Sequence, residues 1–99
     1  MHEIETYERR GREHMKSVIV TFTIPGENNS INYDLEIPSN VPCGFLVVHI
    51  AQTVNNYNRS LNVSPTGKSL FSNRLKRKLN PEETFETAGI WNGDYITFA

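Results

Sequence analysis

The stretch VIVTFTIPGENNSINYDLEI, residues 18–37, contains two segments in which apolar and polar residues alternate. The apolar positions are Val18, Val20, Phe22 and Ile24 in the first segment, and Ile31, Tyr33, Leu35 and Ile37 in the second. A period of two is typical of a strand with one buried face. Pro25-Gly26 and the polar residues 27–30 predict a turn between the segments. The stretch therefore predicts an antiparallel hairpin.

A helix is expected directly after this hairpin, over residues 42–56. Val47, Ile50, Ala51 and Val54 follow the i, i+3, i+4, i+7 spacing of one helix face. Ser39 and Asn40 are candidate caps, and Pro42 suits a first helical turn. We expect this helix to lie across the hairpin.

The remainder of the chain predicts short elements. We expect strands at Lys68–Ser72 and Arg74–Leu79, one helical turn at Phe85–Ala88 and a closing strand at Tyr95–Phe98 after an Asn92-Gly93 turn. The expected core comprises Val18, Val20, Phe22, Ile31 or Tyr33, Leu35, Ile37, Val47, Ile50, Val54, Phe71, Phe85, Ile90, Ile96 and Phe98. The predicted fold class is α+β, with a mixed sheet of four to five strands and one helix across it.

Length and composition fit one small domain without disulfides. The chain has 99 residues, 10 Lys plus Arg against 11 Asp plus Glu, and a single cysteine. A chain that binds nucleic acid usually has a basic excess, which this one does not. No apolar run approaches the roughly 20 residues that span a bilayer. Residues 1–16 are polar and charge-mixed, so we expect a loosely ordered extension before a domain at 17–99, no secretory signal and a cytoplasmic location.

Three segments carry a resemblance to a known family. EIPSN (36–40) resembles the entry from strand to helix in ubiquitin, and SLFSNRL (69–75) resembles its third strand and following turn. TFETAGIWNGDYITF (84–98) matches the closing pattern Leu-x-x-x-Gly-Ile-x-x-Gly-Asp of bacterial ubiquitin-like proteins, with Phe85 in place of the usual Leu. Over about residues 17–99 the chain resembles the ubiquitin-like β-grasp, and within it the YukD/EsaB family of type VII secretion systems.

The resemblance implies a small cytosolic protein that is not conjugated to others. Ubiquitin and sulfur carriers act through a C-terminal diglycine, whereas this sequence contains no Gly-Gly pair. We therefore expect a non-conjugating, protein-binding module, as an accessory or regulatory component of a type VII secretion system. Two alternatives stay open, an accessory subunit of an oxygenase-like enzyme complex and another ubiquitin-like adaptor.

The residues indicate neither an enzyme nor a cofactor or metal site. No GxGxxG, P-loop, HExxH or GxSxG motif is present. The histidines lack metal-ligand spacing with Cys43, which we expect to be a small packing residue near the surface. Adjacent Glu82 and Glu83 favour a charge at the start of the short helix over a catalytic pair.

Two features favour protein binding. The first is the cationic cluster Arg74, Lys76, Arg77 and Lys78 with Leu75 among them, which suits a solvated edge strand, an acidic partner surface or, least favoured, weak nucleic-acid binding. The second is Trp91, expected to be partly exposed in its turn, because Trp and Arg dominate interface hot spots. By analogy with ubiquitin, Leu70 beside Arg74 is the lead docking position. We expect a protein partner, with a membrane secretion component as one candidate, neither nucleic-acid binding nor membrane insertion, and leave the oligomeric state open.

Overall fold

The computed structural model describes residues 16–26 and 28–99. These residues form β1 (Ser17–Ile24), β2 (Ile31–Pro38), α2 (Cys43–Tyr57), β3 (Leu70–Ser72), β4 (Arg77–Lys78), α3 (Phe85–Ala88) and β5 (Tyr95–Phe98). The expected extension lies outside the described residues, apart from its last residue, Lys16.

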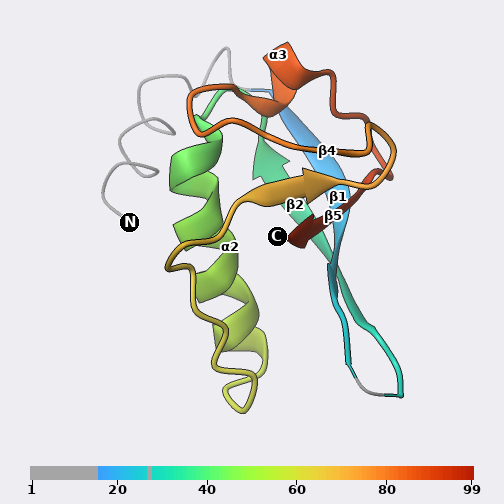
Figure 1. Cartoon of the computed structure of the whole chain (residues 1–99), viewed down its shortest axis with the longest axis vertical. Coiled ribbons are helices and arrows are strands. Elements are labelled where there is room, and N and C mark those ends of the chain that lie inside the picture. Colours follow the sequence, from blue (N-terminus) through green and yellow to red (C-terminus); the bar gives the residue numbers. More distant parts are fainter. Residues whose placement is uncertain (1–15, 27) are drawn as a thin grey trace.

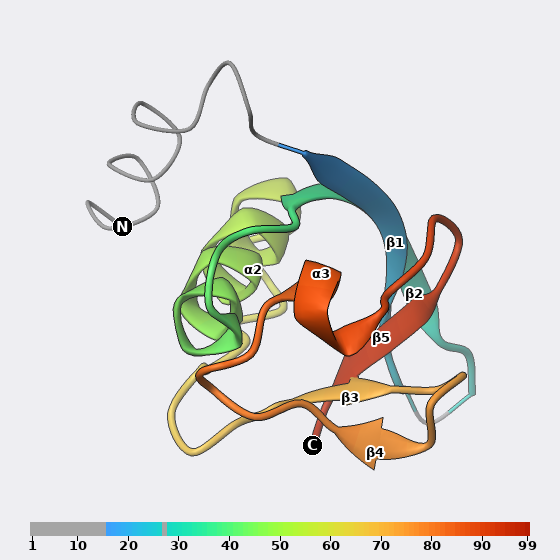
Figure 2. The ribbon, with the colours of Figure 1, turned by 90° about the horizontal axis from the view of Figure 1, so that it is seen from above.

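One five-stranded mixed sheet, in the order β2-β1-β5-β3-β4, carries α2 across one face (Figures 1 and 2). β1 and β2 pair antiparallel without interruption from Ser17 opposite Pro38 to Ile24 opposite Ile31. β1 runs parallel to β5, whereas β3 is antiparallel to both β5 and β4. The predicted hairpin, crossing helix and mixed sheet are thus confirmed.

The core lies between α2 and the sheet face that it covers. Ten expected core residues are buried: Val20, Phe22, Leu35, Ile37, Val47, Ile50, Val54, Phe85, Ile90 and Ile96. Val18, Tyr33 and Phe98 pack against this core while partly exposed, and Ile31 is exposed. The period of two in β1 and β2 therefore predicted the buried face correctly.

The alternation in β3 is opposite to the predicted one. Leu70 and Ser72 are fully buried and pair with Phe98 and Ile96 on the core side. Phe71 pairs with Thr97 and lies on the opposite sheet face. The prediction that Phe71 belongs to the core was therefore wrong.

The strand expected over Arg74–Leu79 is reduced to the two residues of β4. Lys76 has a left-handed backbone conformation, with φ of 59°, and its N–H donates to the Ser72 carbonyl at 2.8 Å. This turn uses the first residues of the expected strand to reverse the chain between β3 and β4.

The start of α2 also differs from the expected capping. Neither Ser39 nor Asn40 caps the helix, which begins directly after Pro42 without a side-chain cap. Instead the N–H groups of Cys43 and Gly44 donate to the carbonyls of Glu83 (2.9 Å) and Pro81 (3.0 Å). These bonds satisfy helix donors that otherwise lack partners and fix the segment before α3 against α2.

Candidate interaction surface

A cluster of hydrogen-bonded and stacked side chains joins the turn after β3 to the turn before β5. The Arg74 guanidinium donates to both carboxylate oxygens of Asp94, from Nε to Oδ1 at 2.8 Å and from Nη2 to Oδ2 at 3.0 Å. Its Cζ lies 3.7 Å from the centroid of the Trp91 ring. Trp91 remains 63% exposed, whereas Asp94 is buried. We call Arg74, Trp91 and Asp94 the Arg74–Trp91 platform.

The Asn92-Gly93 turn fixes this platform to the sheet. Gly93 has φ of 87°, which the predicted turn needs and which a residue with a Cβ rarely adopts. The Asn92 Oδ1 accepts the Ile19 N–H, and the Gly93 N–H donates to the Ile19 carbonyl, both at 2.8 Å. The Trp91 N–H donates to Asp94 Oδ2 at 2.9 Å. The Trp91 backbone is therefore fixed by its own bond to Asp94 and by the bonds between the following turn and β1, while its ring stays largely exposed.

Asp94 supplies the charge at the centre of the platform. Burial opposes ionisation of this carboxyl, but hydrogen bonds from Arg74 and the Trp91 N–H, together with the Arg74 charge, outweigh it and lower its pKa. Arg74 also donates to the Gly89 carbonyl. Asp94 directly follows the predicted Asn92-Gly93 turn, and local patterns do not indicate its ion pair because Arg74 is 20 residues away in the sequence.

The cationic cluster is divided by the fold. Arg77 forms an ion pair with Glu83, with Nη1 and Oε2 2.8 Å apart. The hydrogen bond from Arg77 is the main cause of the lowered pKa of Glu83. Glu83 is thus paired with β4 instead of simply placing charge at the start of α3. Lys76 donates to Asn73 Oδ1 at 3.3 Å, and Lys76 and Lys78 are exposed. Two of the four cations are therefore already balanced by carboxylates.

Leu70 cannot be the docking residue proposed from the sequence, because its side chain is fully buried. Leu75 is partly buried and packs against the core. Two exposed apolar residues of the sheet, Ile19 and Tyr95, lie on the face away from α2, with Phe71 partly exposed on the same face. The correction follows from the β3 alternation, which exchanges Leu70 for Phe71 on that face.

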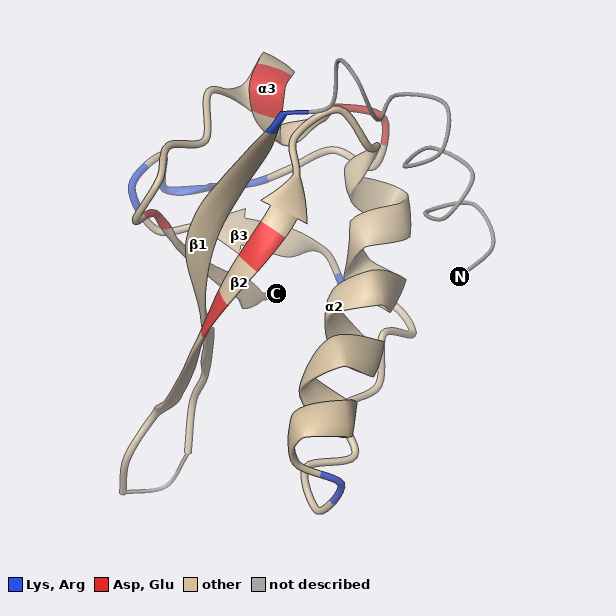
Figure 3. Cartoon of the chain, turned by 180° about the vertical axis from the view of Figure 1, so that it is seen from behind, with Lys and Arg blue, Asp and Glu red and all other residues tan. Residues whose placement is uncertain are grey.

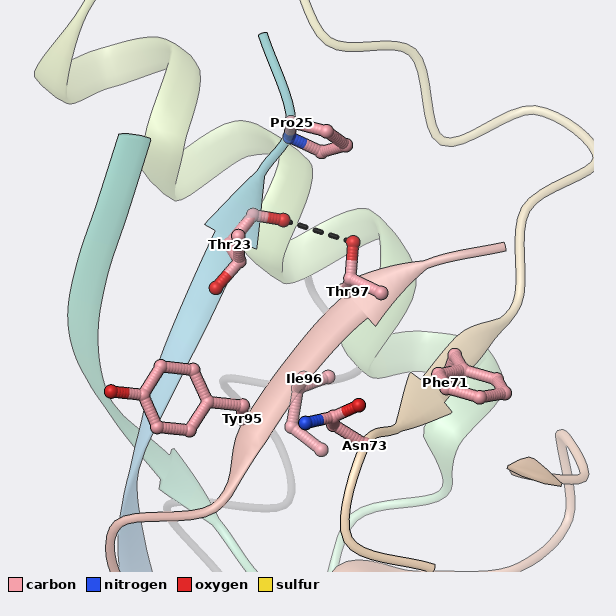
Figure 4. Close-up of a pocket in the computed structure, with 7 residues that line it drawn as sticks. All are labelled: Thr23, Pro25, Phe71, Asn73, Tyr95, Ile96 and Thr97. Carbon is pink, nitrogen blue, oxygen red and sulfur yellow. Dashed lines mark hydrogen bonds between the residues drawn. The ribbon is translucent and has the colours of Figure 1, made fainter. Parts of the chain in front are cut away.

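A pocket of about 310 Å³ opens on the sheet face that carries Phe71 (Figure 4). Its lining comprises Thr23, Pro25, Phe71, Asn73, Tyr95, Ile96 and Thr97. The Thr97 hydroxyl donates to the Thr23 carbonyl at 2.9 Å, which joins β5 to β1 beside the pocket. The pocket is therefore largely apolar and is lined mainly by strand residues.

The described residues contain no cluster of three or more His, Cys, Asp or Glu that could hold a metal. Cys43 is buried in the core instead of near the surface as expected. Burial, reinforced by the Glu83 charge, raises the pKa of its thiol to about 12. The thiol is therefore protonated near neutral pH, which makes it a poor nucleophile. Among the helices of residues 16–26 and 28–99, none has the length and apolarity to cross a bilayer.

The fold is that of a ubiquitin-like domain. The structure resembles ubiquitin from Caldiarchaeum subterraneum, with a TM-score of 0.62, 18% identity and coverage of 84% of this chain and 91% of that one. It also resembles the ubiquitin-like domain of EccD1, a type VII secretion protein of Mycobacterium tuberculosis, with a TM-score of 0.66, 16% identity and coverage of 86% and 99%.

A further likeness is to one chain of an ESX-5 inner membrane complex, with a TM-score of 0.61 and 20% identity over 84% of this chain and 20% of that one. A comparison with curated proteins gives no match. The family model for YukD, a protein of the WXG100 protein secretion system, matches residues 18–97. The chain therefore belongs to the YukD family, as the resemblance implied.

Proposed function

We propose that this chain is a non-enzymatic protein-binding component of a type VII secretion system. In this proposal it acts in the cytoplasm as an accessory or regulatory subunit. Two findings support the proposal: membership of the YukD family and the likeness to domains of secretion proteins, one of them in an inner membrane complex. The expected partner is accordingly a component of the membrane secretion complex.

The observation that carries the proposal is the Arg74–Trp91 platform. An exposed Trp normally loses rotational freedom when a partner covers it, which weakens binding. Here Arg74 lies over the indole, and Asp94 fixes Arg74. The indole is therefore ordered before binding and can act as an anchor with little further entropy loss.

The platform offers a partner two kinds of contact. The indole ring gives a large apolar area, whereas the charge of the stacked guanidinium is balanced by the buried Asp94. The uncompensated positive charge comes from Lys76, which is exposed in the same turn and has no carboxylate partner within the described residues. We expect the partner surface to combine an apolar recess with at least one carboxylate.

Capture from detergent-solubilised host lysate tests the proposal. Immobilised wild-type protein should retain membrane secretion components, and Trp91→Ala should lose them while its circular dichroism spectrum stays unchanged. Val48→Ala is the matched control, because Val48 is 37% exposed on α2 and takes no part in the platform.

Two results would contradict the proposal. Retention of secretion components by Trp91→Ala but not by Val48→Ala would remove the platform from the binding site. Capture of oxygenase subunits in their place would favour an accessory role in an oxygenase-like complex, and capture of proteins unrelated to secretion would favour another ubiquitin-like adaptor.

A further inference from the structure

The two edges of the sheet are protected very differently. β4, at one edge, is two residues long and carries Arg77 and Lys78, which are features that block pairing with another strand. β2, at the other edge, is eight residues long, pairs with β1 without a bulge and contains no Lys or Arg. Within the described residues, no strand lies on its outer side. β2 is thus the edge at which a further strand could add.

The hydrogen bonds of β1 show which of its backbone groups face β5. The Thr21 N–H donates to the Asp94 carbonyl, and the Ile19 carbonyl accepts the Gly93 N–H, both at 2.8 Å. Backbone groups of successive strand residues point to opposite sides. The N–H and carbonyl groups of Val20, between Ile19 and Thr21, therefore face β2.

The register then identifies the free groups of β2. Val20 is opposite Leu35, so the N–H and carbonyl of Leu35 bond to β1. The backbone groups of the alternate residues, Asn32, Asp34 and Glu36, point away from the sheet. Three donors and three acceptors at regular spacing are available along this edge.

The same residues place negative charge beside those groups. Asp34 accepts a hydrogen bond from the Thr21 hydroxyl at 2.8 Å, and Glu36 accepts one from the Ser17 hydroxyl at 2.7 Å. Both acidic residues are exposed, and within the described part of the chain neither has a cationic partner. Figure 3 shows the two acidic positions along β2. A side chain directly opposite them on an added strand would lie about 5 Å away, between Cβ atoms.

The face of β2 that is turned towards α2 is apolar at this edge of the sheet. Tyr33 stacks on Tyr57, which ends α2, with ring centroids 5.7 Å apart. Ile31 is 39% exposed beside them. Successive residues of an added strand would therefore alternate between the carboxylates on one face and these apolar groups on the other.

We propose that β2 is the docking edge for an extended segment of a partner protein that carries Lys or Arg at alternate positions and apolar residues between them. The segment would extend the sheet through the free groups of Asn32, Asp34 and Glu36, a mode known as β-augmentation. A second copy of β2 is a poor occupant, because antiparallel pairing would bring these carboxylates close to those of the other copy. The inference rests on the proposed protein-binding function but uses a different surface from the Arg74–Trp91 platform.

The test uses a capped seven-residue peptide of alternating Lys and Val, with a Glu-Val peptide of the same length as its control. Amide hydrogen exchange of the full chain, followed by NMR, reports the binding position. With the Lys-Val peptide we expect slower exchange at the N–H groups of Asn32, Asp34 and Glu36, and binding about tenfold tighter than with the Glu-Val peptide.

A charge-reversal variant tests the role of the carboxylates. Asp34→Lys/Glu36→Lys should reverse the preference between the two peptides. Glu82→Lys/Glu86→Lys is the matched control, since both residues are exposed and the change in net charge is the same. It should keep the wild-type preference.

Several outcomes would overturn the proposal: equal binding of the two peptides, protection elsewhere on the protein, or slowed exchange at β2 caused by self-association without peptide. The assay needs no secretion component. A negative result in the peptide assay would therefore not contradict the proposed secretion function. A negative result in the lysate capture would likewise not contradict the assignment of β2 as a docking edge.

Discussion

Truncating Leu70 and Phe71 separately tests the arrangement of β3, on which the assignment of the sheet surface depends. The two residues are adjacent and apolar, but Leu70 is 0% exposed whereas Phe71 is only partly buried on the far face. Removing a fully buried Leu side chain loses its transfer free energy and leaves a cavity. Leu70→Ala should therefore lower the free energy of unfolding by about 2–5 kcal/mol. A domain of this size is stable by only about 5–15 kcal/mol in total.

The matched variant Phe71→Ala should cost much less, about 1 kcal/mol or below, although it removes the larger side chain. Urea unfolding followed by circular dichroism gives both values, and an unchanged slope shows that the two transitions are comparable. At about 4–8 °C per kcal/mol, the melting temperatures of the two variants should differ visibly. If Phe71→Ala lowered the free energy of unfolding as much as Leu70→Ala or more, the observed alternation in β3 would be refuted, and Leu70 would be the exposed residue of the pair.

Three further predictions concern the core and the platform. Ile50→Ala, at the centre of the buried face of α2, should lower the free energy of unfolding by about 2–5 kcal/mol, and an unchanged urea midpoint would contradict this packing. Folding lowers the pKa of Asp94, so its ionised carboxylate stabilises the folded state at pH values above the unfolded pKa of about 3.9. This stabilisation is lost as the pH falls through the lower pKa of the folded state. Wild type should thus be more stable than Asp94→Asn at pH 6, with a smaller difference at pH 3; a constant difference would argue against the ion pair. The Cys43 thiol should react with a thiol reagent at pH 8 only after urea unfolding, and rapid reaction of the folded protein would disprove its burial.

The long elements were predictable because several residues repeat the same signal. Eight residues in each hairpin strand show the period of two clearly, and the apolar face of α2 recurs over two turns. β3 has only three residues, so the adjacent pair Leu70 and Phe71 fits either alternation equally well. The choice between them is made by pairing with β5, which the local sequence does not encode.

The candidate surface was predictable only in part, for a related reason. Trp91 was expected to be exposed because it lies within a turn signal, and the structure confirms this exposure. Its partners Arg74 and Asp94 meet through a pairing between β3 and β5 that local patterns cannot reveal. The cationic cluster suggested one surface, yet Arg77 faces Glu83 while Arg74 faces Asp94. A run of cations in a sequence thus overestimates the net positive charge of the surface when the fold places carboxylates beside some of them.

The platform and the β2 edge can be engaged by one partner or by two. The turn that carries Trp91 bonds to Ile19 of β1, and Ile19 is opposite Glu36 of β2, so only β1 separates the two surfaces. If one partner covers both, Trp91→Ala and Asp34→Lys/Glu36→Lys should affect its affinity through a shared bound geometry. Their combined effect would then depart from the sum of the separate effects by more than about 0.5 kcal/mol. Additive losses would instead indicate contacts that form independently, and loss of different proteins in the two variants would assign each surface its own partner.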